Sequence, residues 1–407
     1  IHMGTGEDFE PTNYVIENGV LYGFEPSHAS LPDTLRTRLS SLGEKADIGG
    51  LQRFFSENKA HFIPHAKVFI PVAEGVAQEY NNKIGQVVQK EERGKSVHNK
   101  QHIARASYQP INGQGYIPGS GFKGAIRTAM LDKINNGQQV PIDQKTKKKE
   151  TSNTLEKRLF DGDFATSPLR LLKVADFMPQ GELARKIVFA TNRKKQSVID
   201  PATGQERQSK GVETRKEIIA HGQYRALQAD VTIQDLGQQI GTKDTPKMRL
   251  PELRELAQQS NRYYRPQLAQ ELNLLAHRGF CHKGWYDSLI KLLNGELKAK
   301  LDAGDAFLVR LGGSGGAESK TLRGDGVSSI KIMLGKNAQG KQDSTYMTET
   351  KTIWLAADNT NQRADMYPFG WALVELDPQA DLAQLQSWCA EQSTQYPDIR
   401  SIREQHK

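Results

Sequence analysis

Two spacings of hydrophobic residues run through this 407-residue chain, one typical of strands and the other of helices. Apolar positions on both sides of Asn18-Gly19 predict a β-hairpin over residues 14–22, because this dipeptide favours a tight two-residue turn. Amphipathic spacing predicts helices over residues 31–42, 50–56, 120–135 and 250–301, the last broken near Pro266 and Gly279. Since strands and helices do not alternate regularly, the pattern favours an α+β fold over a doubly wound sheet.

The other apolar runs predict short strands, which lie over residues 169–175, 186–190, 217–219, 226–233, 307–311, 350–356 and 371–376. We expect the strands at 217–219 and 226–233 to pair with each other. Polar stretches separate these elements. Residues 73–101 are predicted to be an exposed segment, and the stretches 145–149 and 191–212 to be basic loops. No repeat of solenoid period is found.

Composition adds a mild preference for an acidic partner. Hydrophobic residues make up 37% of the chain and charged residues 25%, as in a soluble globular protein. Lys and Arg number 55 against 47 for Asp and Glu, which gives a net charge of +8 and weakly favours a nucleic acid. Cys281 and Cys389 lack the spacing of a zinc site or a disulfide framework, so we expect a reducing cytoplasm. No membrane span, signal peptide or cofactor is predicted.

The most informative motif lies at residues 116–129, where a proline-glycine turn leads into a helix that carries Lys123 and Arg127. Backbone N–H groups and the positive end of the helix dipole make such a start a site for anions. The two cations are spaced i and i+4 and therefore share one helix face. We expect them to bind phosphate in a cradle shaped by Gly119, Ser120 and Gly121. The alternative is a helix start with ordinary surface cations. The order of Lys and Gly does not fit a Walker A loop, which argues against a nucleotide triphosphatase.

Two other glycine segments are candidates for the same role. The first follows the strand predicted at 307–311, and the second lies at the start of the chain. Both can bring the backbone close to a ligand, although a flexible hairpin loop and a tight turn are the alternatives. Their candidate phosphate-binding residues are Gly312, Gly313, Ser314, Gly315 and Lys320 in the first, and His2, Gly4 and Gly6 in the second.

Weaker signals concern metal and aromatic residues. His98 and His102 are spaced i, i+4 and would share one face of a helix, but the surrounding Lys and Arg repel a cation, so no metal site is predicted. The acidic pair in Asp161-Gly162-Asp163 is better explained as a turn. Tyr263 and Tyr264 beside arginines have the composition of a base-stacking pair, although half-buried helix positions are the preferred interpretation.

Together, the glycine segments and their order resemble the RAMP superfamily. Residues 117–128, IPGSGFKGAIRT, are similar to the signature IPGSSLKGAIRTA of that superfamily, with Gly121 in place of the second serine. The chain start, the segment after residue 307 and Pro368-Phe369-Gly370-Trp371 are similar to its other glycine motifs. Their spacing resembles the family of the fifth subunit of the type III-A CRISPR (Csm) effector.

The resemblance implies an RRM-like, ferredoxin-like palm with inserted helices. We expect the palm over residues 1–233, a helical insertion over 234–305, and strands over 306–407 that complete the palm or form a second lobe. It also implies a non-catalytic subunit that caps the effector backbone and holds the 3′ part of the guide (cr)RNA. The implied partners are target RNA, the repeated backbone RAMP subunit, the small helical Csm subunit and a trimming nuclease.

Two alternatives remain open at this point. The first is a metal-independent endoribonuclease that trims the guide precursor, with His2, His98, His102 or His282 as general base, although no second catalytic group stands at a recognisable spacing. The second is a scaffold that recruits a trimming nuclease through the basic loops at Lys145 and at Lys194-Lys195.

Overall fold

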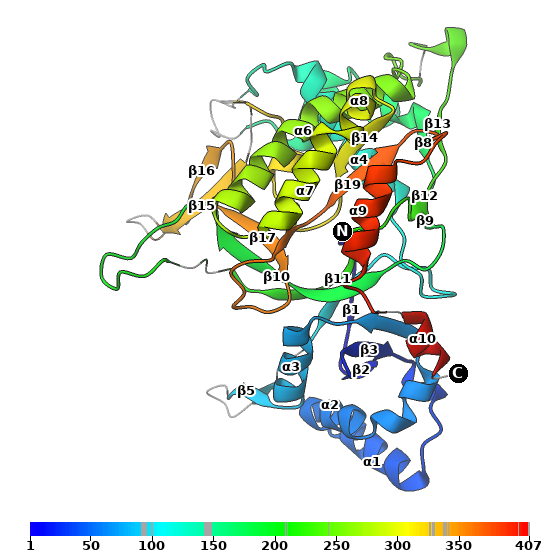
Figure 1. Cartoon of the computed structure of the whole chain (residues 1–407), viewed down its shortest axis with the longest axis vertical. Helices are drawn as coiled ribbons and strands as arrows, with labels where there is room; N and C mark the ends of the chain where they lie inside the picture. The colour runs from blue at the N-terminus through cyan, green and yellow to red at the C-terminus, as the bar shows by residue number, and fades with distance from the viewer. Residues whose placement is uncertain are drawn as a thin grey trace.

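A six-stranded sheet crosses the middle of the molecule, between a helical body and a smaller lobe (Figure 1). The computed structural model describes residues 1–90, 96–98, 101–141, 149–207, 209, 211–242, 244–324, 327, 330–336, 340, 342–397 and 399–405. In spatial order, the strands of this sheet are β1 (Gly4–Phe9), β7 (Ile103–Ala106), β11 (Thr214–Ile219), β10 (Arg185–Lys194), β17 (Thr352–Ala357) and β18 (Tyr367–Pro368). The pair β7–β11 is parallel and its neighbours are antiparallel.

Helices and a two-stranded sheet form the body on one side. They are α4 (Gly119–Asn135), α6 (Leu253–His277), α7 (Lys283–Asn294), α8 (Glu296–Ala303), α9 (Ala383–Ser393), β14 (Ala306–Arg310) and β19 (Trp371–Glu375). Their apolar faces share one core, in which Phe122, Tyr264, Leu272 and Phe307 are buried. The short helix α5 (Ser152–Leu159) follows α4 in the chain and contacts it.

The smaller lobe has a core of its own. It contains β2 (Tyr14–Glu17), β3 (Val20–Gly23), β4 (Val68–Pro71), α1 (Asp33–Glu44), α2 (Ile48–Glu57) and α3 (Glu74–Lys83). Phe24, Phe54, Phe55 and Phe62 cluster between the lobe's sheet and helices. From the other end of the chain, α10 (Ile399–Glu404) returns to pack against β4, so the C-terminal residues lie beside this lobe (Figure 1).

Short two-stranded ladders complete the structure. They are β5 (Val87–Lys90) with β6 (Ser96–His98), β8 (Leu172–Val174) with β13 (Val231–Ile233), β9 (Met178–Pro179) with β12 (Leu227–Gln228), and β15 (Ile330–Lys336) with β16 (Gln342–Met347). The α+β class predicted from the sequence is confirmed. In the part of the chain that the structure describes, no helix is long and apolar enough to span a membrane.

Several predicted elements are confirmed. The hairpin at 14–22 forms as β2 and β3, with positive φ at both Asn18 and Gly19 as a two-residue turn requires. Helices form near 31–42, 50–56 and 120–135, and strands form near 307–311, 350–356 and 371–376. Each of these elements is specified by its own periodicity or turn residues, which is why the sequence predicts them.

Other predictions are wrong, and the reason in each case is tertiary packing. The expected break at Pro266 is absent, because buried positions on both sides of the proline, among them Tyr263 and Leu268, anchor α6 as one helix. The segment 73–101 is not simply exposed. It contains α3, whose Val76 and Tyr80 are buried at i, i+4 under the sheet.

The strands near 217–219 and 226–233 do not pair with each other. Instead, β11 lies between β7 and β10, while β12 and β13 pair with β9 and β8. The predicted start of the loop over 191–212 is wrong, because β10 continues to Lys194, which pairs with Thr352 of β17. Arg193 is tolerated in this buried stretch because its guanidinium donates to Thr360 O (2.8 Å) and Gln362 O (3.0 Å).

Changing either of two glycines of α4 to alanine is expected to alter the stability of the fold, in opposite directions. A Cβ at Gly124 would meet no atom within 4 Å, so Gly124→Ala should stabilise the fold by about 0.5–1 kcal/mol through helix propensity. At Gly119 a Cβ would lie 2.6 Å from both Val174 O and Ala175 O, so Gly119→Ala should destabilise it by about 1–3 kcal/mol. Urea unfolding of both variants measures the change in the free energy of unfolding. Equal changes for the two variants would contradict the close packing at Gly119.

Candidate nucleic-acid interface

The glycine segments identified in the sequence come together around the first residues of the chain. Gly312, which has φ of +76°, lies so close to the N-terminal strand that an added Cβ would stand 2.1 Å from His2 O and 3.1 Å from Met3 Sδ. On the other side, a Cβ at Gly121 would stand 2.4 Å from Met3 Cε. The N–H of Gly313 donates to His2 O at 2.9 Å. Residues 2–3 are therefore held between the start of α4 and the loop that follows β14.

His2 helps to build this site without adding a positive charge to it. Its ring is buried, and Nδ1 lies 2.7 Å from Glu217 O on β11. Since a carbonyl oxygen only accepts, Nδ1 carries the proton and donates it. Burial lowers the pKa of His2 to about 4, so the imidazole is neutral near pH 7.

The start of α4 differs from the cradle of free N–H groups that the sequence predicts. The N–H of Gly119 donates to the Asp176 carboxylate at 2.8 Å, and that of Gly121 donates to Pro118 O at 3.0 Å. A carboxylate therefore already occupies the positive end of the helix dipole. The expectation of free N–H groups is wrong for these glycines, because Asp176 lies far along the chain and its approach leaves no local signal. Ser120 is exposed beside them.

The two predicted cations of α4 are in different situations. Arg127 is paired, since its guanidinium lies 3.1 Å from the Glu156 carboxylate on α5. Lys123 has no carboxylate partner within the described residues. Its pKa is lowered by partial burial and by the neighbouring ammonium of Lys173 on β8.

A further lysine, which the sequence analysis missed, points at the glycine-rich loop. Lys216 comes from β11, and its Nζ donates to Ser314 Oγ at 3.0 Å. Burial, and then the nearby Lys320, lowers its pKa. No carboxylate lies within ion-pair distance of either lysine in the described residues. The only local signal was a run of charged residues, Arg215 to Glu217, within a strand.

We call Lys123, Lys173, Lys216 and Lys320 the lysine face. The charge of Lys173 contributes to the lowered pKa of Lys123, and that of Lys320 to the lowered pKa of Lys216, while partial burial weakens the solvation of Lys123 and Lys216. Other cations close to the glycine segments, such as Arg185 and Lys195, are neutralised by carboxylates. Unneutralised like charges are unfavourable in the free protein and become favourable when an anion binds between them.

The remaining predicted residues lie at the edge of this site or behind it. Gly4 begins β1, and Gly6 adopts φ of +85° with open space at its Cβ position. Gly315 lies against the side chain of Arg310, and Lys320 ends the short helix η6 (Glu318–Lys320). The described part of the lysine-rich stretch 145–149 is Lys149 alone, so Lys145, Lys147 and Lys148 lie outside the described residues.

The histidines named as alternative general bases for a ribonuclease lie in separate elements of the fold. His98 lies in β6 rather than on a helix, so it does not share a helical face with His102, whose Nδ1 is 3.4 Å from Asp8. His282 caps α7 by accepting from Gly284 N. Among the described residues there is also no group of three or more His, Cys, Asp or Glu side chains placed to hold a metal ion.

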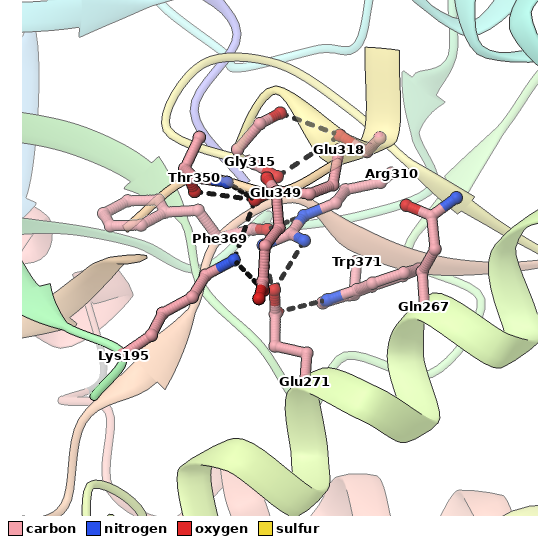
Figure 2. Close-up of polar contacts among 12 residues, drawn as sticks. Lys195, Gln267, Glu271, Arg310, Gly315, Glu318, Glu349, Thr350, Phe369 and Trp371 are labelled. Carbon is pink, nitrogen blue, oxygen red and sulfur yellow. Dashed lines mark hydrogen bonds and ion pairs between the residues drawn. The ribbon is translucent and has the colours of Figure 1, made fainter. Parts of the chain in front are cut away.

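Behind the glycine-rich loop, Lys195 is part of an ion-pair cluster and not a free basic surface. The Glu318 carboxylate lies 2.7 Å from Lys195 Nζ and accepts from the N–H and the hydroxyl of Thr350, each at 2.6 Å (Figure 2). Burial alone would raise the pKa of Glu318, but Lys195 and the Thr350 hydrogen bonds lower it to about 2. This cluster ties the loop to the end of β10 and the start of β17.

One family model matches part of this chain. The model of the RAMP superfamily matches residues 101–266, which include β7, α4, β10 and β11. This segment is therefore similar to the RAMP superfamily, as its signature indicates. Among curated proteins, none matches the chain.

Two solved structures are similar to the chain, each with a TM-score below 0.5. A crystal structure of T. onnurineus Csm5 has a TM-score of 0.43 and 14% identity, over 77% of this chain and 87% of that one. A chain in the cryo-EM structure of a Csm–crRNA–target RNA ternary complex of a type III-A CRISPR-Cas system has a TM-score of 0.43 and 17% identity, over 92% of this chain and 97% of that one.

The Glu318 cluster makes stability depend on pH in a defined window. Because its pKa falls from 4.5 in the unfolded chain to about 2 in the folded one, the carboxylate stabilises the fold above pH 4.5. That contribution disappears as pH falls from 4.5 to about 2. The difference in unfolding free energy between wild type and Glu318→Gln should therefore shrink across this window. Urea titrations at several pH values measure it, and a difference independent of pH would refute the assignment.

Proposed function

We propose that this chain is a non-catalytic RNA-binding subunit of a type III-A CRISPR ribonucleoprotein, in which it caps the backbone and holds the 3′ part of the guide RNA. The lysine face beside the RAMP signature carries this proposal, because it offers cations without carboxylate partners at the place where the glycine segments meet. Phosphate contacts of this kind position a nucleic acid without selecting its sequence, which suits a guide of variable sequence.

The topology supports an RRM-like palm for the central sheet. Strands β1, β7, β11 and β10 are neighbours in that order, with the middle pair parallel and the outer pairs antiparallel. A ferredoxin-like sheet has this pattern of directions, and α4 follows β7 as the first helix of such a unit would. In this proposal the palm falls within residues 1–233, residues 234–305 form the helical insertion, and residues 306–407 supply β17 and β18 to the central sheet and form the two-stranded sheet of β14 and β19.

The RNA-binding residues proposed are Lys123, Lys173, Lys216, Lys320, Ser120 and Ser314. The glycines Gly119, Gly121, Gly312, Gly313 and Gly315, together with His2, Gly4 and Gly6, would shape the surface and bring the RNA backbone close to these side chains. In the assembled cytoplasmic complex, the proposed partners are guide and target RNA, the repeated backbone RAMP subunit, the small helical subunit and a trimming nuclease.

Removing lysines of the face should weaken RNA binding and its dependence on salt. For Lys123→Ala/Lys216→Ala we expect lower affinity for a labelled guide RNA and a salt slope that is shallower by about 0.7 for each phosphate that is no longer neutralised. Lys133→Ala is the matched control, since Lys133 lies on the same helix α4 but is paired with Glu255 at 3.0 Å. Gel shifts at several salt concentrations give both quantities.

Two results would oppose the proposal. If the double variant kept the wild-type affinity and slope, the lysine face would not be the RNA site. If the wild-type protein instead cut the guide at discrete positions in the presence of EDTA, the chain would be a processing ribonuclease.

Alkaline pH offers an independent check on Lys216. Because its pKa is lowered and RNA favours the charged form, raising the pH should remove this contact before an ordinary lysine would lose its proton. Lys216→Arg stays charged throughout, so the decline of its affinity should begin at higher pH than in wild type. Affinities measured across the alkaline range at constant salt compare the two. Superimposable profiles would show that Lys216 does not contact the RNA.

A further inference from the structure

A buried ion pair lies directly beneath the glycine-rich loop. Arg310, the last residue of β14, is almost fully buried and donates to both carboxylate oxygens of Glu271 on α6, at 2.6 and 2.9 Å. Its Nε donates to Phe369 O at 3.0 Å (Figure 2). Since the guanidinium is planar and held on two edges, its orientation is fixed.

The indole of Trp371 contacts both members of this ion pair. Its Nε1–H donates to Glu271 Oε1 at 2.8 Å, and the centre of the Arg310 guanidinium lies 4.8 Å from the centre of the indole ring (Figure 2). The carboxylate of Glu271 is thus bonded to an arginine and an indole at once, and both side chains are held in one conformation.

The backbone of the loop rests on this guanidinium. A Cβ at Gly315 would lie 3.1 Å from Arg310 Nε and 3.4 Å from its Cγ and Cδ, so the glycine is in close contact with the arginine. Ser319 Oγ donates to Gly315 O at 3.2 Å and to Gly316 O at 3.1 Å, which holds the same peptides from the other end. The position of Gly315 is therefore set by Arg310 and Ser319 together.

Next to Gly315 stands the residue that meets the lysine face. Ser314 has φ of +62°, an unusual conformation for a serine, and its Oγ accepts from Lys216 Nζ. The N–H of Gly313 is bonded to His2 O. Any displacement of Gly315 is transmitted through one peptide bond to the hydroxyl that orients Lys216.

We propose that Arg310 and Glu271 are positioning residues for RNA binding: they fix the loop Gly312–Gly316 so that Ser314 holds Lys216 toward the phosphate. This inference rests on the proposed function. A buried ion pair is seldom more stabilising than a well-packed apolar pair of similar volume, so stability alone is a weak reason for it. The ion pair lies beneath the peptide next to Ser314, whose hydroxyl accepts a hydrogen bond from Lys216. Holding this peptide in place is a second reason for the ion pair.

The test replaces the charges while keeping the volume. Arg310→Met/Glu271→Leu leaves no unpaired buried charge within the pair, so the protein should stay folded at room temperature, as checked by circular dichroism. We expect its affinity for guide RNA to fall about tenfold, because a loosely held site binds less well. Arg265→Ala is the control, since Arg265 also lies on α6 but pairs with Asp302 on α8 at 2.6 Å.

A double-mutant cycle separates positioning from general destabilisation. If the ion pair acts through Ser314, then adding Ser314→Ala to Arg310→Met/Glu271→Leu should cause no further loss of affinity. If the losses of affinity from Ser314→Ala and from Arg310→Met/Glu271→Leu multiply, the inference is overturned. An unchanged affinity in the folded Arg310→Met/Glu271→Leu variant would also overturn it. Should that variant not fold, Gly315→Ala displaces the same peptide while both charged residues are kept. Gly315→Ala should then weaken RNA binding, and adding Ser314→Ala to it should cause no further loss of affinity. If the two substitutions lower the affinity independently, the inference is overturned.

Failure of the two proposals can be told apart. If Lys216→Ala leaves affinity and salt slope unchanged, the proposed RNA site itself is wrong. If Lys216→Ala weakens binding but the variants at Arg310, Glu271 and Gly315 do not, the RNA site stands and only the positioning role is refuted.

Discussion

The close approach of Gly312 to the carbonyl of His2 is the contact on which the proposed site depends. A side chain at residue 312 would collide with the backbone of His2, which precedes β1, and one at Gly121 would meet the end of the Met3 side chain from the opposite side. These contacts place the first residues of the chain, the start of α4 and the loop after β14 together. Only then do Lys216 of β11 and Ser314 of the loop meet. The site therefore exists only in the completed fold.

The proposed RNA site differs from an ordinary basic surface in that its lysines have no carboxylate partners within the described residues. Arginines near it, such as Arg127 and Arg185, are neutralised by carboxylates of the same chain. Lys123 and Lys216 are not, and each is close to a second lysine while being partly buried. Such an arrangement costs stability in the free protein, and a bound phosphate chain would remove that cost. Net charge alone would not have distinguished these residues.

Local signals made part of the fold predictable from the sequence. The hairpin turn at Asn18-Gly19 and the helix that follows Pro118 both carry their own turn residues and periodicity. The neighbours of β11, the cap that Asp176 provides and the continuity of α6 through Pro266 are set by residues far away in the chain, and no local pattern encodes them. The candidate site divides in the same way. Its glycines and Lys123 belong to motifs, whereas Lys216 and Lys173 join it only through strand pairing.

The glycines have a different physical role from the one their motifs imply. In α4 the N–H of Gly119 is bonded to a carboxylate, and the missing side chains at Gly119 and Gly121 make room for Ala175 O and Met3. At the loop, Gly312 and Gly315 make room for His2 O and Arg310. At Gly119 and Gly312 glycine is required, because backbone carbonyl oxygens fill the space that a side chain would need. In the proposed function, side chains would therefore recognise phosphate, and their binding would depend on how rigidly the packed glycines hold Ser314 and Lys216 in place.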